Sequence, residues 1–152
     1  MSERKTASPM SKKFIPKPIE PKILPLVDAI NQIKWFKTFS SCEGHFKKKE
    51  QEITDRNHAD VRFDLLKNGT LEQAEHFMWY LIAEFGNGVI PAYISAYKLY
   101  VPKAKGQSDF VFVIQIFPIN RFESAKNKRK HTDMGIQRAT IIVDKYAKKI
   151  QK

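Results

Sequence analysis

The chain contains a single cysteine, Cys42, so it forms no internal disulfide. It also lacks any apolar run near the roughly 18 residues that a transmembrane helix requires, and its basic N-terminus lacks the apolar stretch of a secretory signal. We therefore expect a soluble, cytoplasmic protein with no membrane association. A length of 152 residues, 42% of them hydrophobic, allows one domain to bury a core without a structural metal.

Basic residues are abundant and unevenly placed. The chain has 27 Lys and Arg against 16 Asp and Glu, a net charge of +11. Residues 1–22 contribute +4 and residues 121–152 contribute +7, whereas residues 23–120 are neutral. Because Lys and Arg that neutralise phosphates release condensed counterions, this distribution favours a nucleic acid as partner. Solvated basic tails that bind nothing in particular would have the same charge.

The chain divides into an arm and a single domain. Residues 1–22 contain four prolines among polar residues and form a basic N-terminal arm, since this composition buries little apolar surface. Residues 23–152 form one domain that ends in a basic helix. Apolar spacing of three and four predicts helices over residues 23–33, 71–85 and 134–152. Alternation and β-branched content predict strands over residues 34–40, 61–65, 93–101 and 109–117.

This order of elements, α-β-β-α-β-β-α, predicts an α+β fold with a four-stranded mixed sheet packed against helices. The second helix is the best marked, because Thr70 and Gln73 fit a capping box, and it predicts a crossover between the second and third strands. The last strand, which contains FVFVIQIF, is apolar on both faces. It is expected to be central and covered on both sides, or to extend into the interface of a homodimer.

Polar and reactive side chains concentrate in the segment Thr38–His45, which we call the motif segment (TFSSCEGH). Hydroxyl groups, backbone amides and a glycine able to adopt a positive φ suit an anion or small ligand. The anion-binding candidates are Thr38, Ser40, Ser41 and Gly44. The candidates for nucleophilic or acid–base catalysis are Cys42, Glu43 and His45.

Structural roles are an alternative explanation for Cys42, Glu43 and His45. A lone cysteine is often a small buried side chain, and local solvation or turn hydrogen bonds account for the glutamate and the histidine. A zinc site would have suitable ligand types but no recognised close spacing, so no metal is expected. Its ligands would be Cys42, His45, His58 and His131.

The stretch from Pro21 to His45 resembles the opening of the tRNA wybutosine-synthesising protein 3 family, methyltransferases that act on a hypermodified guanosine next to the anticodon. In that family a helix ending in Asn leads to a strand and a Thr-Thr-Ser-Ser-Cys-Ser-Gly-Arg motif. Residues 59–86 also resemble its downstream strand and helix. The matching positions are Asn31, Thr38, Ser40, Ser41, Cys42 and Gly44, and the differing ones are Phe39, Glu43 and His45. The resemblance implies the fold, a binding loop, an RNA partner and S-adenosylmethionine as cofactor.

A second group of basic residues precedes the last predicted helix and continues on it. Lysine runs of this kind contact phosphates without reading bases. Together with the lysines that follow the motif segment, they would surround it if the fold brings them together; a solvated helix face is the alternative. The nucleic-acid-binding candidates are Lys47, Lys48, Lys49, Lys126, Lys128, Arg129, Lys130 and Arg138.

Three functions follow from these patterns. The first is binding of a nucleic acid, RNA rather than DNA, with the motif segment holding an anionic group. The second is RNA methylation with S-adenosylmethionine, as the resemblance implies. The third is a non-enzymatic interaction module that binds an acidic protein.

Overall fold

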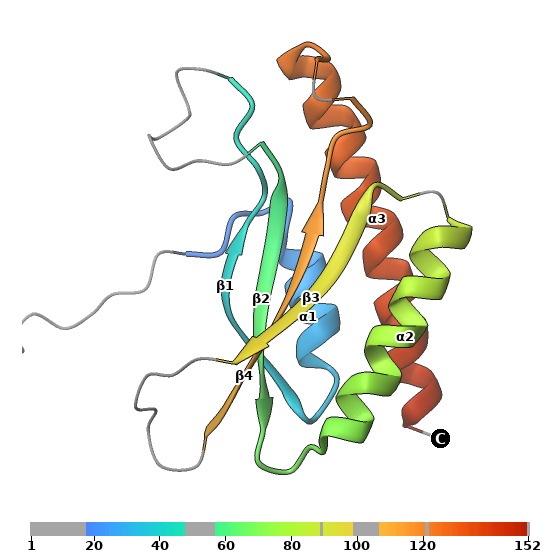
Figure 1. Ribbon diagram of the computed structural model, residues 1–152. Helices are drawn as coiled ribbons and strands as arrows, with labels where there is room; N and C mark the ends of the chain where they lie inside the picture. Colours follow the sequence, from blue (N-terminus) through green and yellow to red (C-terminus); the bar gives the residue numbers. More distant parts are fainter. Residues whose placement is uncertain (1–17, 48–56, 89, 99–106, 121, 152) are drawn as a thin grey trace, which may run out of the picture.

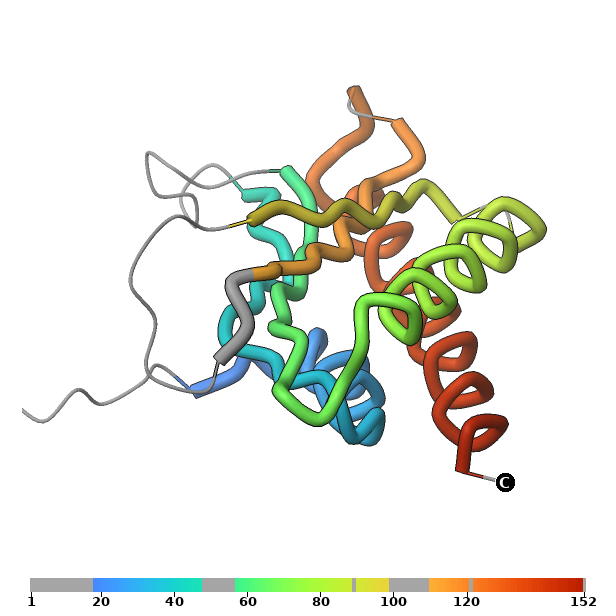
Figure 2. The backbone as a smooth tube through the Cα atoms, turned by 60° about the horizontal axis from the view of Figure 1, so that its bottom comes forward, coloured from blue at the N-terminus to red at the C-terminus, as the bar shows by residue number. Residues whose placement is uncertain are grey.

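The computed structural model describes residues 18–47, 57–88, 90–98, 107–120 and 122–151. Its helices and strands follow one another in the predicted order and form a small α+β domain, with the three helices on one face of the sheet (Figures 1 and 2). The elements are α1 (Leu24–Asn31), β1 (Phe36–Cys42), β2 (Ala59–Leu66), α2 (Leu71–Asn87), β3 (Ala92–Lys98), β4 (Gln107–Ile116) and α3 (Ala125–Ile150).

The four strands lie in the order β1-β2-β4-β3, and each neighbouring pair is antiparallel. The sheet is thus antiparallel and not mixed, because β4 lies between β2 and β3. These two strands run in the same direction but do not touch. The chain passes from one to the other through α2, which makes the predicted crossover and completes a split β-α-β unit.

The core lies between the sheet and the helices. The alternation predicted for the second strand is confirmed, since Val61, Phe63 and Leu65 of β2 are buried on the helix side. β4 is central, as predicted, and its side chains from Val111 to Ile116 are buried on both faces. Among the described residues, none of the helices is both long and apolar enough to cross a membrane.

The last helix begins earlier than predicted. α3 starts at Ala125 instead of Met134, and the Ser124 side chain caps it by accepting a hydrogen bond from the Asn127 backbone N–H (3.2 Å). Residues 125–133 contain no large apolar side chain, so hydrophobic spacing does not reveal these turns. The run from Lys126 to Lys130 consequently lies on the helix, not before it.

α3 is fixed against the rest of the fold by an aromatic residue near its C-terminal end. Tyr146 is 2% exposed and packs against Phe77 and Tyr80 of α2, with ring centroids 5.0 and 4.9 Å apart. Its hydroxyl group lies 2.8 Å from His76 Nδ1. Burial raises the pKa of Tyr146, and the neighbouring Tyr80 adds to that shift. The long helix is therefore anchored at one end, and its other end reaches the motif segment (Figure 1).

Candidate functional site

The first half of the motif segment belongs to a strand. β1 runs to Cys42, two residues beyond the predicted end at Ser40, and its register shifts between Thr38 and Ser40. Thr38 faces α1, where its Oγ1 accepts a hydrogen bond from Asn31 Nδ2 (2.9 Å) and its N–H donates to Asn31 Oδ1 (3.0 Å). This pair ties the end of α1 to β1. Thr38, proposed as an anion ligand, has a structural contact here.

The rest of the motif segment and the two residues after it form a loop, residues 43–47, which we call the motif loop. Gly44 adopts φ +89°, so the predicted positive φ is confirmed. A Cβ at this position would lie 2.9 Å from Phe46 Cζ, and Phe46 is buried. Only glycine therefore meets both the conformation and the close approach of the Phe46 ring.

Replacing Gly44 with alanine is expected to lower the free energy of unfolding by about 2 kcal/mol, because a side chain in the left-handed region is strained and the Phe46 ring must move. Urea denaturation of the two proteins measures this difference. The matched control is Gly86→Ala in α2, where a Cβ meets nothing within 4 Å; it should raise stability by about 0.5 kcal/mol. Equal effects of the two substitutions would contradict the role assigned to Gly44.

Arg129, one turn into α3, holds the motif loop against the helix. Its guanidinium group donates to the backbone carbonyls of Gly44 and Glu43, both at 2.7 Å, and to Asp133 Oδ1. The group also lies 5.1 Å from the centre of the Phe46 ring. Four of the five N–H donors of this arginine are used within the protein. These contacts fix the motif loop against α3.

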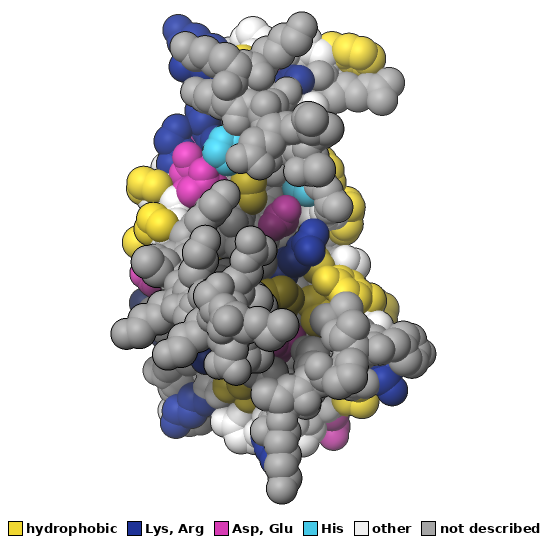
Figure 3. Space-filling model, turned by 90° about the vertical axis from the view of Figure 1, so that its left-hand side faces the viewer, with side chains coloured by type: hydrophobic (Ala, Val, Ile, Leu, Met, Phe, Trp, Pro, Cys, Tyr) yellow, Lys and Arg dark blue, Asp and Glu magenta, His cyan; other side chains and the backbone are white. Residues whose placement is uncertain are grey.

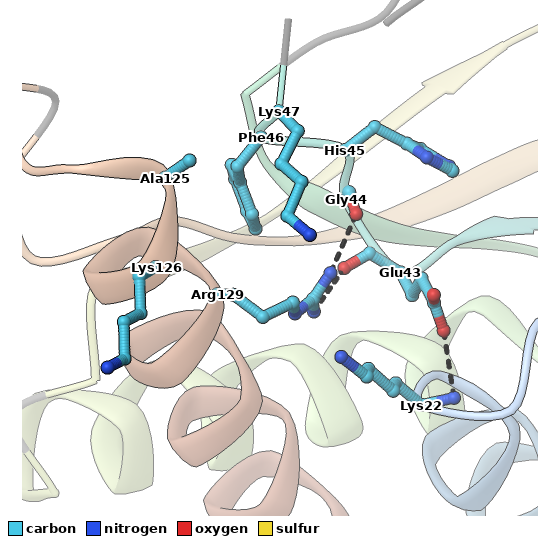
Figure 4. Close-up of a pocket in the computed structure, with 9 residues that line it drawn as sticks. All are labelled: Lys22, Glu43, Gly44, His45, Phe46, Lys47, Ala125, Lys126 and Arg129. Carbon is cyan, nitrogen blue, oxygen red and sulfur yellow. Dashed lines mark hydrogen bonds between the residues drawn. The ribbon is translucent and has the colours of Figure 1, made fainter. Parts of the chain in front are cut away.

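The motif loop and the first turns of α3 enclose a pocket of about 660 Å³. Its lining residues are Lys22, Glu43, Gly44, His45, Phe46, Lys47, Ala125, Lys126 and Arg129. In the close-up, the amino groups of Lys22 and Lys47 lie on either side of the Arg129 guanidinium group (Figure 4). In the space-filling view, basic, acidic and histidine side chains lie next to one another in the upper left of one face (Figure 3). The pocket thus brings together basic side chains from three distant parts of the sequence, namely Lys22, Lys47 and the start of α3.

Two acidic groups near the pocket form hydrogen bonds or ion pairs within the protein. Glu43 Oε2 accepts a hydrogen bond from the Lys22 backbone N–H at 2.9 Å. Asp133 pairs with Arg129 and lies 3.6 Å from Lys22 Nζ. These contacts tie the segment before α1, the motif loop and α3 together. Sequence reasoning did not identify Lys22 or Asp133 as part of the site.

The predicted nucleic-acid-binding residues separate into groups. Three of them, Lys47, Lys126 and Arg129, line the pocket. Lys128 and Lys130 lie on the same end of α3 but do not line it. Arg138 is two and a half turns further along α3, where it donates to the Gly88 carbonyl (3.4 Å) away from the loop. Lys48 and Lys49 lie outside the described residues.

The predicted catalytic side chains do not all meet at one point, because Glu43 lies apart from Cys42 and His45. The Glu43 carboxylate faces Lys22, whereas His45 points away from Arg129 (Figure 4) and pairs with Glu20, with 3.0 Å between His45 Nε2 and Glu20 Oε2. Cys42 is next to this pair, and its Sγ accepts a hydrogen bond from the Gly44 N–H (3.4 Å). Glu20, which the sequence analysis placed in the N-terminal arm, is thus the carboxylate beside the thiol and the imidazole.

The remaining motif residues and histidines lie apart from the pocket. Ser40 and Ser41 are successive residues of β1, so their side chains point to opposite faces of the sheet, and neither lines the pocket. His58 contacts Gln115 (3.1 Å) and lies 3.5 Å from Asp60, while His131 contacts Glu123 (2.8 Å). The four-ligand zinc site considered from the sequence therefore does not assemble as a group in the described part of the chain.

Comparison with known proteins adds no relative. No family model, curated protein or solved structure matches the chain. The resemblance to the wybutosine-synthesising family stays a prediction that rests on the motif segment and the residues before it.

Proposed function

We propose that this protein binds RNA and holds a phosphate group in the pocket between the motif loop and α3. The observation that carries the proposal is the convergence of Lys22, Lys47, Lys126 and Arg129 on one pocket. Each comes from a segment whose position depends on the fold, so their proximity is not a property of a single lysine run. A cytoplasmic location, where RNA is accessible and a lone thiol stays reduced, belongs to the same proposal.

The surroundings of the pocket suit a phosphate. The N-terminal end of α3 carries the positive end of the helix dipole and has no acidic residue in its first turn. Lys126 lies in that turn and lines the pocket. Lys side chains and helix N-termini contact phosphates and position a nucleic acid without reading its bases. The resemblance of the motif segment to a tRNA-modifying family supports RNA over DNA.

Exposed aromatic residues favour a single strand over a duplex. Tyr93 and Tyr97 are 50% and 38% exposed on β3. They lie four residues apart and so share one face of β3. Because the alternating residues Ala92 and Ile94 pack against the core, this is the face opposite the helices, and Tyr93 stacks on Phe117 at 5.2 Å. Unpaired bases stack on such rings, and a duplex leaves its bases inaccessible to them.

The test compares two triple variants with equal charge changes. The first, Lys22→Ala/Lys47→Ala/Lys126→Ala, removes the lysines of the pocket. The control, Lys145→Ala/Lys148→Ala/Lys149→Ala, removes three exposed lysines from the other end of α3, roughly 30 Å away along the helix axis at 1.5 Å per residue. Fluorescence anisotropy with single-stranded RNA, duplex RNA and duplex DNA, with heparin as competitor, gives the affinities.

The pocket variant is expected to bind single-stranded RNA at least about tenfold more weakly than wild type, and the control is expected to change little. RNA affinity that falls equally in both variants would indicate a general charge effect and overturn the proposal. If the protein binds RNA no more tightly than it binds heparin, the RNA-binding proposal is also overturned. That result would favour an acidic protein as partner.

A further inference from the structure

Three side chains of the types that bind metal ions meet on the side of the motif loop that faces away from Arg129. They are Glu20, which precedes α1, Cys42 at the end of β1 and His45 in the motif loop. The carboxylate oxygen, the thiol sulfur and the imidazole nitrogen all lie within 4.8 Å of one another, and all three residues are partly buried. The separation of 3.0 Å between His45 Nε2 and Glu20 Oε2 shows that two of them already touch.

We propose that Glu20, Cys42 and His45 bind a zinc ion. Thiolate, imidazole and carboxylate are the three ligand types that Zn²⁺ takes in proteins, and a set that includes sulfur excludes Mg²⁺ and Ca²⁺ as preferred ions. Tetrahedral Zn²⁺ with its usual bond lengths places such ligand atoms about 3.3 to 3.6 Å apart. Atoms that lie within 4.8 Å reach this spacing by small side-chain rotations.

The backbone around the three ligands is held in place. Glu20 Oε1 accepts a hydrogen bond from the Glu43 N–H at 3.1 Å, which leaves Oε2 directed at His45. The Gly44 N–H donates to Cys42 Sγ (3.4 Å), which orients the sulfur. Partners of this kind orient metal ligands and raise metal affinity. Arg129 fixes the same loop from its other side by donating to the carbonyls of Gly44 and Glu43.

In the described part of the chain the site has three protein ligands, and a three-ligand zinc site takes water or an oxygen of a bound ligand in its fourth position. A zinc ion with an open position polarises a bound phosphoryl oxygen or lowers the pKa of its water. The zinc proposal does not rest on RNA binding, because the ligands and the lysines of the pocket are different residues.

The experiment measures metal binding by the full chain. Zinc affinity is determined by isothermal titration calorimetry, and the protein is also loaded with Co²⁺ to record the thiolate-to-cobalt charge-transfer absorption. Because Cys42 is the only cysteine, that absorption reports on one residue. The variants are Cys42→Ser and Glu20→Gln, and the matched control is His131→Gln, which removes a histidine that also pairs with a carboxylate (Glu123, 2.8 Å) but has no thiol beside it.

One zinc per chain and a charge-transfer band are expected for wild type and for His131→Gln. Cys42→Ser should abolish the band, and Glu20→Gln should weaken zinc binding by roughly tenfold or more. Far-UV circular dichroism shows whether each variant is folded. Alkylation of Cys42 by iodoacetamide in the wild-type protein gives a readout that needs no variant: added Zn²⁺ should slow it, and a chelator should restore the rate. An alkylation rate unaffected by Zn²⁺, or zinc affinity unchanged in Cys42→Ser and Glu20→Gln, would overturn the proposal.

Discussion

Replacing Arg129 with alanine is expected to lower the free energy of unfolding by about 1.5 to 3 kcal/mol, the range of hydrogen bonds that involve a charged group. The substitution leaves the carbonyls of Gly44 and Glu43 without their donor and removes the ion pair with Asp133. It also uncovers the Phe46 ring. Because the motif loop then loses its attachment to α3, RNA affinity should fall together with stability.

Urea denaturation and the anisotropy assay measure the two effects of the Arg129 substitution. Arg129→Lys keeps the charge but should recover less than half of the lost stability, since a lysine ammonium lacks the planar fork that reaches two carbonyls at once. Lys130→Ala is the control, because that exposed neighbour should change stability by no more than about 0.5 kcal/mol. An Arg129→Ala protein as stable as wild type would contradict the role of Arg129 in holding the motif loop against α3.

Replacing Phe63 with alanine is expected to lower the free energy of unfolding by about 3 to 5 kcal/mol. Phe63 is 0% exposed at the centre of an aromatic cluster. Its ring centroid lies 5.0 Å from that of Phe36, 5.5 Å from Phe112 and 6.1 Å from Phe77, so the cluster joins β1, β2, β4 and α2. Truncation leaves a cavity that these elements cannot close without moving.

The control for the Phe63 substitution is Phe39→Ala. Phe39 is 52% exposed at the irregular position of β1, so its loss should cost less than about 1 kcal/mol. Thermal or urea unfolding of the two variants compares the same chemical change at a buried and an exposed site. Similar losses in both would show that the aromatic cluster does not carry the stability assigned to it.

The elements predictable from the sequence are those with local signals. The capping box at Thr70 and Gln73 is present with both of its hydrogen bonds, at 3.1 and 3.0 Å, because it depends on residues only three apart. The alternation in β2 and the apolar composition of β4 identified strands because buried strands need those patterns. The start of α3 was missed because its first turns bury no large apolar side chain.

The site was less predictable, because its contacts join residues far apart in the sequence. The motif segment was recognised from its polar residues, and glycine, which adopts a positive φ without strain, marked the position where this conformation occurs. The pairings of Glu20 with His45 and of Arg129 with Gly44 span 25 and 85 residues, and no local pattern signals them. Glu20 was missed because its proline-rich surroundings suggested an arm.

The most direct test of RNA binding at the pocket is the salt dependence of affinity. The logarithm of the association constant for single-stranded RNA is measured against the logarithm of salt concentration for wild type and for Lys22→Ala/Lys47→Ala/Lys126→Ala. Each phosphate contact contributes about 0.7 to the slope for a single strand, so the loss of three contacts should make the slope shallower by about 2. Parallel lines for the two proteins would show that these lysines do not contact phosphates and would contradict the proposed site.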